Sequence, residues 1–412
     1  SPQQRTQVPL YWWQGSHPVI VAEESRHHVP SVPVDLTSET SKEILQKIEE
    51  MAGQQVALSD SLTYDLALDS LSIMELGTWI EQEYGTTIDN LETLGTVEQV
   101  IQAARGSLVH HETTSLIVDE NWFHENKEKL TIPQPEPATK QRTDTTISKL
   151  FLIQAQKSPQ AMIITDQIAG CKTYRDILTT IFALRPIFSR LTGQNVGIML
   201  PATASATISY LAMLFSEKTP VMFNWTVGIA NMHHGIELTH TQHIVTSKQL
   251  YNKLIDQGIA LDTCTVKWLF LEDMRGSIPL YHKIAAALQA RFRTHTLKTG
   301  KLNDHAAILF TSGSESRPKA VPLTHANILA NLYDIMKYHT FQSNDCLLGM
   351  LPPFHALGLS GTVVLPVCIG LRTVYHANPT ESSLLNRVIE AYYASIVIST
   401  PTFLGNILHT GK

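Results

Sequence analysis

The sequence is poor in cysteine and lacks any long run of apolar residues. Four cysteines occur among 412 residues and none belongs to a Cys-x-x-Cys pair, so neither a zinc site nor a dithiol redox motif has support. Scattered, unpaired cysteines are typical of a reduced compartment. The best membrane-span candidate, residues 359–370, is shorter than the ~20 residues that cross a bilayer and is expected to be core. We expect a cytoplasmic protein, with any inner-membrane association residing in regions outside this fragment.

A positive charge excess is also missing. The formal net charge is −6 at pH 7, and the 31 Lys and Arg residues look scattered, which argues against a nucleic-acid partner. Hydrophobic residues make up 43% of the chain, enough for a large core in two or three domains. Since the chain starts at Ser1 and stops at Lys412 just after an apolar stretch, we expect a fragment of a longer polypeptide.

Four segments differ in composition. Residues 1–37 are interpreted as the tail of an upstream domain, and residues 38–105 have helical periodicity throughout. Residues 106–145 are polar and contain three closely spaced prolines, which predicts a linker, with room for one short amphipathic piece near Trp122. From residue 146 to 412, apolar strands alternate with helical stretches.

The last segment has the pattern of an α/β domain. Apolar runs predict strands at 196–200, 221–223 and 306–310, and helices are expected to follow the first of these and to start near Thr324. Strands that alternate with helices favour a sheet with crossover helices. The predicted fold class is therefore α/β overall, preceded by a small all-α unit.

The helical segment contains a serine placed for chemistry. Leu68-Asp69-Ser70-Leu71 opens the second of three or four predicted short helices, where backbone N–H groups and the helix dipole favour an anion. A third helix opens at Thr96, with Gln99 completing a capping box. Asp-Ser before an apolar run is also an ordinary helix cap, so the dipeptide alone decides nothing.

Residues 43–104 as a whole resemble an acyl carrier protein. The first helix, the long loop, Leu68 to Leu71 and an acidic second helix with Glu75, Glu81 and Glu83 all agree with that family. The resemblance implies a four-helix carrier domain in which Ser70 carries a 4′-phosphopantetheine arm, added by a separate phosphopantetheinyl transferase. The acidic helix suits docking to basic patches on partner enzymes.

A second motif, residues 310–321, follows an apolar strand and precedes a helix. Glycine and small hydroxyl residues let backbone N–H groups approach phosphate oxygens, and Lys319 offers a point charge. The lysine does not directly follow the glycine, so this is not the loop of kinases and GTPases. A polar surface loop is the alternative. The hydroxyl donors are Thr311, Ser312 and Ser314.

The loop closely resembles the phosphate loop of adenylate-forming enzymes. Residues 351–359, with Pro353-Phe354-His355, and residues 399–404 resemble segments that border the acyl pocket in that superfamily. The resemblance implies an incomplete N-terminal α/β domain that uses ATP and Mg²⁺, with Lys319 and His355 as catalytic residues. It assigns no metal ligand here, since the family's later motifs are expected beyond Lys412. The expected contacts to the ATP phosphates are Thr311, Ser312, Gly313, Ser314, Glu315 and Lys319.

Two positions depart from the family pattern. Ser316 and Ala320 stand where the family usually has glycine, and each adds a Cβ near the phosphates. This departure leaves a non-catalytic pseudo-ligase as one alternative. A loading module of a peptide or polyketide synthetase is another, although such modules normally place the carrier after the adenylating domain.

Within the superfamily, the loop and Thr402-Phe403-Leu404-Gly405 most resemble the acyl-ACP synthetase half of bifunctional 2-acylglycerophosphoethanolamine acyltransferase/acyl-ACP synthetases. That resemblance implies activation of a fatty acid as acyl-AMP and its transfer to a phosphopantetheine thiol on the carrier domain in cis, feeding phospholipid acylation. No histidine has aspartate five positions later. An acyltransferase domain with that signature is therefore expected only upstream of Ser1.

Overall fold

The structure is a computed structural model that describes residues 38–60, 62, 66, 68, 70–85, 96–105, 116, 118, 119, 122, 123, 128–132, 145–297, 304–311 and 317–410. The expected upstream tail, residues 1–37, and the centre of the phosphate loop, residues 312–316, lie outside these residues.

The first unit is built from three described helices, α1 (Glu39–Ala52), α2 (Ser70–Tyr84) and α3 (Val97–Ala104). Their apolar faces form a core of their own, which includes Ile44, Ile48, Leu76, Ile80, Val100 and Ile101. The predicted capping box at Thr96 and Gln99 is confirmed. The fourth helix of the expected bundle has no counterpart among the described residues, and most of residues 61–69 and 86–95 lie outside them.

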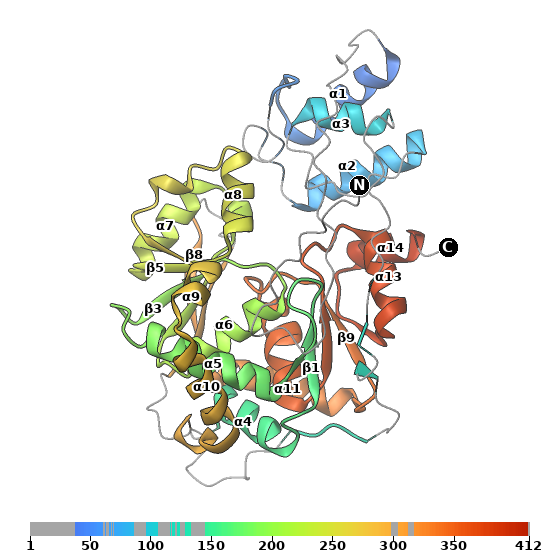
Figure 1. Ribbon diagram of the computed structural model, residues 1–412. Coiled ribbons are helices and arrows are strands. Elements are labelled where there is room, and N and C mark those ends of the chain that lie inside the picture. The colour runs from blue at the N-terminus through green and yellow to red at the C-terminus, as the bar shows by residue number, and fades with distance from the viewer. Residues whose placement is uncertain are drawn as a thin grey trace, which may run out of the picture.

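The second unit contains two mainly parallel sheets (Figure 1). In the six-stranded sheet, only the last strand is antiparallel, and the strand order is β6 (Lys267–Phe270), β5 (His243–Thr246), β3 (Asn195–Ile198), β4 (Thr219–Met222), β7 (His305–Thr311) and β8 (Lys319–Thr324). The predicted strands at 196–200, 221–223 and 306–310 are confirmed as β3, β4 and β7.

The five-stranded sheet is also mainly parallel. Its order is β11 (Ile396–Val397), β9 (Cys346–Gly349), β10 (Arg372–Tyr375), β1 (Met162–Thr165) and β2 (Lys172–Thr173), and only β2 is antiparallel. Strands buried on both faces read as continuous apolar runs, and the three strands predicted from such runs all belong to the six-stranded sheet.

The two sheets share one core. Helices α4 (Ile147–Lys157), α5 (Tyr174–Phe188), α6 (Ala204–Leu214), α11 (His325–Tyr338) and α12 (Leu365–Ile369) contribute to a cluster that also contains residues of both sheets. Helices α7 (Ile229–Thr239) and α8 (Lys248–Asp256) cover the outer face of the six-stranded sheet. Helices α13 (Ser382–Tyr392) and α14 (Pro401–Thr410) cover the outer face of the other (Figure 1). The result is a layered α/β domain, as predicted.

Part of the segment expected as a linker packs against this domain. The indole of Trp122 is fully buried, its ring meets the edge of Tyr392 at 5.8 Å, and the guanidinium of Arg372 donates to its backbone carbonyl. Farther along, the amide of Leu130 donates to the carbonyl of Phe341 (2.8 Å). Within residues 106–145, these described positions therefore pack against the second unit.

Candidate functional site

The carboxyl ends of the two sheets come together. Trp225, which follows β4, packs edge-on against Phe354, which follows β9, with ring centroids 4.9 Å apart. Trp225 also contacts the cores on both faces of the six-stranded sheet. In open α/β sheets, ligands bind beyond the carboxyl ends of the parallel strands. A site is therefore expected at this junction. The phosphate loop and the Pro353-Phe354-His355 segment both follow strands at this edge.

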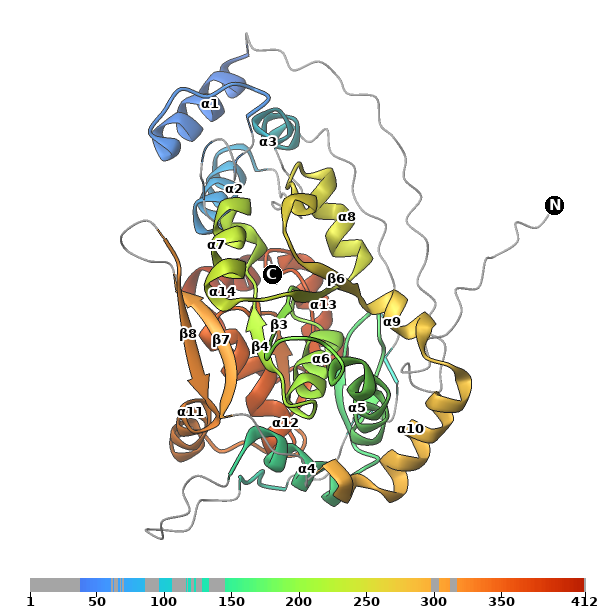
Figure 2. The same ribbon diagram turned by 90° about the vertical axis from the view of Figure 1, so that its left-hand side faces the viewer.

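The ends of the phosphate loop are held by a β-hairpin. Thr311 is the last residue of β7, Lys319 is the first of β8, and the two are cross-strand partners. Both side chains are exposed. A ring nitrogen of His234 on α7 lies 3.1 Å from the carbonyl oxygen of Pro318, so α7 steadies the returning strand (Figure 2). The hairpin thus places a hydroxyl and an ammonium group side by side. Ser312, Gly313, Ser314 and Glu315 lie outside the described residues.

His355 stands in the turn after β9. Its amide donates to the carbonyl of Pro352 (3.1 Å), and its ring lies 4.7 Å from the ring of Phe354. The residue is exposed, but apolar neighbours on one side partly desolvate the ring, which lowers the pKa of His355 below its ordinary value. This shift favours the neutral imidazole, which donates one hydrogen bond and accepts one.

Gly358, the glycine of the Pro-x-Phe-His-x-x-Gly segment, is required by packing. It begins the π-helix η6 (Gly358–Val364), and a Cβ added there would lie 2.0 Å from the carbonyl oxygen of Pro352. The close approach of helix and turn fixes the segment that carries Phe354 and His355.

Gly358→Ala is therefore expected to destabilise the second unit by about 3 kcal/mol, because the turn or the helix must shift. Gly405→Ala is the matched control, since Gly405 lies inside α14 with no atom within 4 Å of an added Cβ. It should stabilise by about 0.5–1 kcal/mol. Thermal unfolding of the two variants checks the pair, and equal melting temperatures would contradict the packing argument.

A buried carboxylate ties the end of β1 to α6. Asp166 accepts hydrogen bonds from the backbone amides of Ile168 (2.9 Å), Ala169 and Ala204 (2.8 Å), the last at the start of α6. The neighbouring Lys172 is also buried and donates to the carbonyl of Ala169. Burial lowers the pKa of Lys172 to about 8. Both groups are engaged with backbone, so their role is to hold this edge of the sheet.

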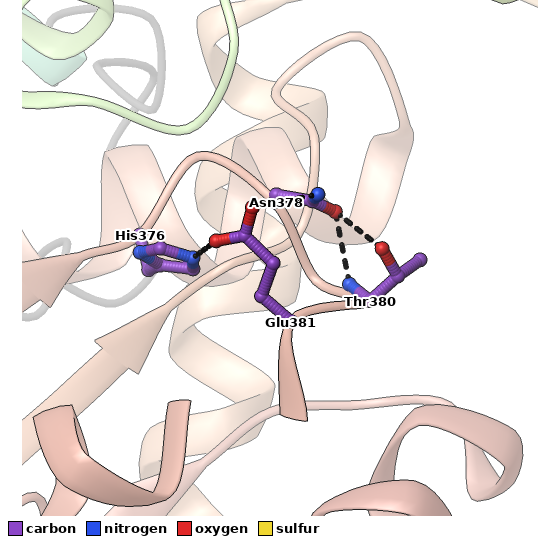
Figure 3. Close-up of polar contacts among 4 residues, drawn as sticks. All are labelled: His376, Asn378, Thr380 and Glu381. Atoms are coloured by element: carbon purple, nitrogen blue, oxygen red, sulfur yellow. Dashed lines mark hydrogen bonds and ion pairs between the residues drawn. The ribbon is translucent and has the colours of Figure 1, made fainter. Parts of the chain in front are cut away.

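A second polar cluster follows β10 (Figure 3). A ring nitrogen of His376 lies 2.7 Å from a carboxylate oxygen of Glu381, and the amide of Asn378 donates to the other oxygen at 3.2 Å. The backbone amide and hydroxyl of Thr380 donate to Asn378 at 3.0 and 2.7 Å. Burial opposes ionisation of Glu381, but the hydrogen bond and charge of His376, with Asn378 and with Lys253 of α8, lower its pKa overall.

A depressed carboxyl pKa has a defined effect on stability. Glu381 stabilises the fold above its unfolded pKa of about 4.3, and this contribution is lost as the pH falls through the lower folded value. Glu381→Gln should therefore unfold more easily at pH 7, by about 1–3 kcal/mol, and the gap to wild type should close below pH ~4. Glu390→Gln, at an exposed position of helix α13, which begins one residue after Glu381, is the control and should unfold like wild type. Melting curves across this range check the prediction, and a gap that does not change with pH would contradict it.

The carrier serine lies in the first unit. Ser70 is the first residue of the 15-residue helix α2, as predicted, although its side chain lies outside the description. The first four amides of a helix have no partner within it and, with the helix dipole, suit a phosphodiester. The position therefore fits a phosphopantetheine arm.

Sequence reasoning missed three residues of the second unit. The sequence did not predict the contacts of Trp225, His234 and His376, each of which makes a specific contact at the carboxyl edge of a sheet. For Trp225 and His376, the available signal in the sequence was their position one to three residues after a strand. His110 and His111 lie outside the described residues.

The comparisons with known proteins agree with this geometry. Residues 151–412 match the family described as AMP-binding enzyme. The chain belongs to the AMP-binding enzymes. Residues 42–104 match the phosphopantetheine attachment site family, so an AMP-binding domain and a carrier domain occur in one chain. Bound ATP and a phosphopantetheine arm are the ligands that these families imply.

Similar curated proteins are acid–thiol ligases. A long-chain-fatty-acid–CoA ligase of Bacillus subtilis is 24% identical over 271 residues, covering 58% of this chain and 47% of the relative. The long-chain-fatty-acid–[acyl-carrier-protein] ligase AEE15 of Arabidopsis thaliana is 33% identical over 99 residues, covering 24% of this chain and 13% of the relative. The chain thus spans about half or less of the length of these proteins.

Solved structures show the same fold. The N-terminal domain of FACL13 from Mycobacterium tuberculosis superposes with a TM-score of 0.52 at 17% identity, covering 64% of each chain. The nonribosomal peptide synthetase FmoA3 gives a TM-score of 0.52 at 14% identity, covering 68% of this chain and 27% of that one.

The described part of the chain lacks two features. None of its helices is both long and apolar enough to cross a membrane. No group of three or more His, Cys, Asp or Glu side chains within it could hold a metal ion.

Proposed function

We propose that this chain is part of a fatty acid–[acyl-carrier-protein] ligase that loads the carrier domain in its own chain at Ser70. The observation that carries the proposal is the pairing of an AMP-binding domain with a phosphopantetheine carrier domain. Relatives named as acyl-carrier-protein ligases support the acceptor, and one of them is a medium-chain enzyme of Teredinibacter turnerae. A short tether raises the effective concentration of the carrier to the millimolar range.

The first half-reaction joins the acid to ATP. A carboxylate oxygen of the fatty acid attacks the α-phosphorus, the bond from that phosphorus to the bridging oxygen breaks, and pyrophosphate leaves with the electron pair. Negative charge builds on the phosphoryl oxygens, where preorganised donors lower the barrier. We assign this task to Lys319, Thr311 and the loop between them, since these two residues are cross-strand partners at the end of the hairpin that bears the loop.

The neighbouring groups orient the substrates. Phe354 and Trp225 form an apolar junction at the carboxyl edge, against which an acyl chain can pack. His355 adds a neutral hydrogen-bonding ring beside them. When bound at Ser70, the arm supplies a thiol that accepts the acyl group while AMP leaves. Mg²⁺ is an expectation from the family resemblance, and none of these residues is assigned to bind it.

Pyrophosphate exchange on the complete polypeptide tests the substrate class. We expect ATP–pyrophosphate exchange with fatty acids and none with amino acids, because the described junction of Trp225, Phe354 and His355 offers no carboxylate to a substrate ammonium group. Octanoate, palmitate and a set of amino acids are the probes. Exchange driven by an amino acid alone would overturn the proposal.

A loading module of a peptide or polyketide synthetase is the second candidate. The hybrid synthetase PyvA of Aspergillus violaceofuscus is 23% identical over 265 residues, covering 62% of this chain but 6% of the synthetase. This similarity supports the second candidate. The carrier precedes the adenylating domain here, which favours the ligase. A role in phospholipid acylation requires an acyltransferase domain upstream of Ser1, and sequencing the full reading frame decides whether one exists.

A further inference from the structure

Helix α10 (Leu280–Phe292) turns an apolar face to the solvent. Its exposed side chains include Leu280 at 72%, Phe292 at 67% and Leu288 at 55%, with Tyr281 and Ile284 beside them. At 100° per residue, these five lie on one arc of the helix. We call them the α10 stripe.

The buried residues of the helix lie on its opposite side and are small. Ala286 and Ala290 are buried, and α10 makes its main contacts with α5. Figure 2 shows α10 on the outer edge of the domain. The large apolar side chains therefore contribute nothing to the core of this unit, although contiguous exposed apolar surface of this kind usually marks an interaction site.

The chain segment that contains the stripe carries only positive charges. Residues 274–303 contain no Asp or Glu and six Lys or Arg, although the whole chain has a net charge of −6. The expectation that basic residues are scattered is thus wrong for this segment. Among the described positions, the basic residues are Arg275, Lys283, Arg291 and Arg293.

The charge pattern selects among partners. A second copy of this chain that packed stripe against stripe would bring the same basic residues together, which is unfavourable in a symmetric interface. An anionic lipid surface satisfies both features, because apolar and aromatic side chains enter the acyl boundary while Lys and Arg meet the headgroups. The helix has 13 residues, so at 1.5 Å per residue it is about 20 Å long and suits lying on a bilayer rather than crossing it.

We propose that α10 is a peripheral membrane-binding helix that lies in the headgroup region of an anionic bilayer, with the α10 stripe facing the acyl chains. The inference stands apart from the proposed reaction. It also places membrane contact within this chain, where the sequence suggested only regions outside it. Each Lys or Arg held near an anionic surface raises the partition constant about fivefold.

Vesicle co-sedimentation of the 412-residue chain tests the proposal. The chain should sediment with vesicles of phosphatidylglycerol and phosphatidylcholine in equal parts, not with phosphatidylcholine alone, and added NaCl should weaken binding. Ile284→Glu and Leu288→Glu should each reduce the partition constant by about tenfold or more. The matched control is Leu238→Glu, at a 47% exposed leucine of α7, which should bind like wild type.

A charge variant covers the case in which a stripe variant fails to fold. Replacing Arg291 and Arg293 together by Gln should lower the partition constant about 25-fold, whereas Arg190→Gln at another exposed position should leave it unchanged. Failure of the wild-type chain to bind anionic vesicles would overturn the proposal, and so would stripe variants that bind like wild type. A dimer in size-exclusion chromatography that Ile284→Glu disrupts, without vesicle binding, would assign the stripe to a second copy instead.

Discussion

Ser70→Ala is expected to abolish phosphopantetheine loading of the carrier domain. The proposed attachment is a phosphodiester on the hydroxyl of Ser70, and Ser70 begins α2, where the helix dipole and the amides of the first turn favour a phosphate. Co-expression with a broad-range phosphopantetheinyl transferase, followed by intact mass spectrometry, should show one arm on the wild-type chain and none on the variant. Acyl transfer in cis should disappear with it.

Ser72→Ala provides the matched control for this experiment. Ser72 lies in the same helix, two residues farther along, so its loss changes helix composition equally but removes no attachment atom. This variant should be modified like wild type. A wild-type domain that is folded by circular dichroism yet never modified would refute the carrier role of Ser70. Modification that persists in Ser70→Ala would place the arm elsewhere.

The layered fold could be predicted because its strands are buried on both faces. Continuous apolar runs such as residues 196–200 and 306–310 mark parallel strands without reference to the rest of the chain. The capping box at Thr96 was equally local, since both of its hydrogen bonds join residues three apart. Signals of this kind depend on one segment at a time.

The contacts that build the site depend on two segments at once. Trp225 and Phe354 are 129 positions apart, and only the arrangement of the two sheets brings their rings together. Trp122 lies in a polar, proline-containing stretch that predicts a linker, yet in the structure it packs against Tyr392 and accepts a hydrogen bond from Arg372. Composition and periodicity carry no information on such pairings, so the sequence showed the motifs but not which residues of the two sheets meet beside them.

The exposed α10 stripe shows a different limit. Apolar residues at helical spacing predict a core-facing side, and small residues such as Ala286 and Ala290 carry little such signal. In the structure the alanines face the core and the large side chains face outward. Which face of a helix packs is decided by the neighbouring helix α5, because two helices approach closely where side chains are small.

Lys319→Ala is expected to slow acyl-AMP formation by about 10- to 150-fold, since one charge-assisted hydrogen bond to a phosphate is worth roughly 1.5–3 kcal/mol. The fold should survive, because Lys319 is exposed at the first position of β8. The measurement is the single-turnover rate of acyl-AMP formation on the complete polypeptide, with the melting temperature as a check.

Lys267→Ala is the matched control for the loop, because it tests position and not charge alone. Lys267 is also an exposed lysine at the first position of a strand in the same sheet, but β6 is parallel, so its first residue lies at the opposite edge from the loop. The control variant should adenylate like wild type.

Restoring the family glycines with Ser316→Gly and Ala320→Gly should leave the rate equal or higher, because it removes two Cβ atoms near the phosphates. If Lys319→Ala and Lys267→Ala were equally active, Lys319 would have no part in phosphate binding. If the complete wild-type polypeptide showed no ATP-dependent chemistry and the glycine variants restored none, the second unit would be a pseudo-ligase and only the carrier domain would keep a proposed role.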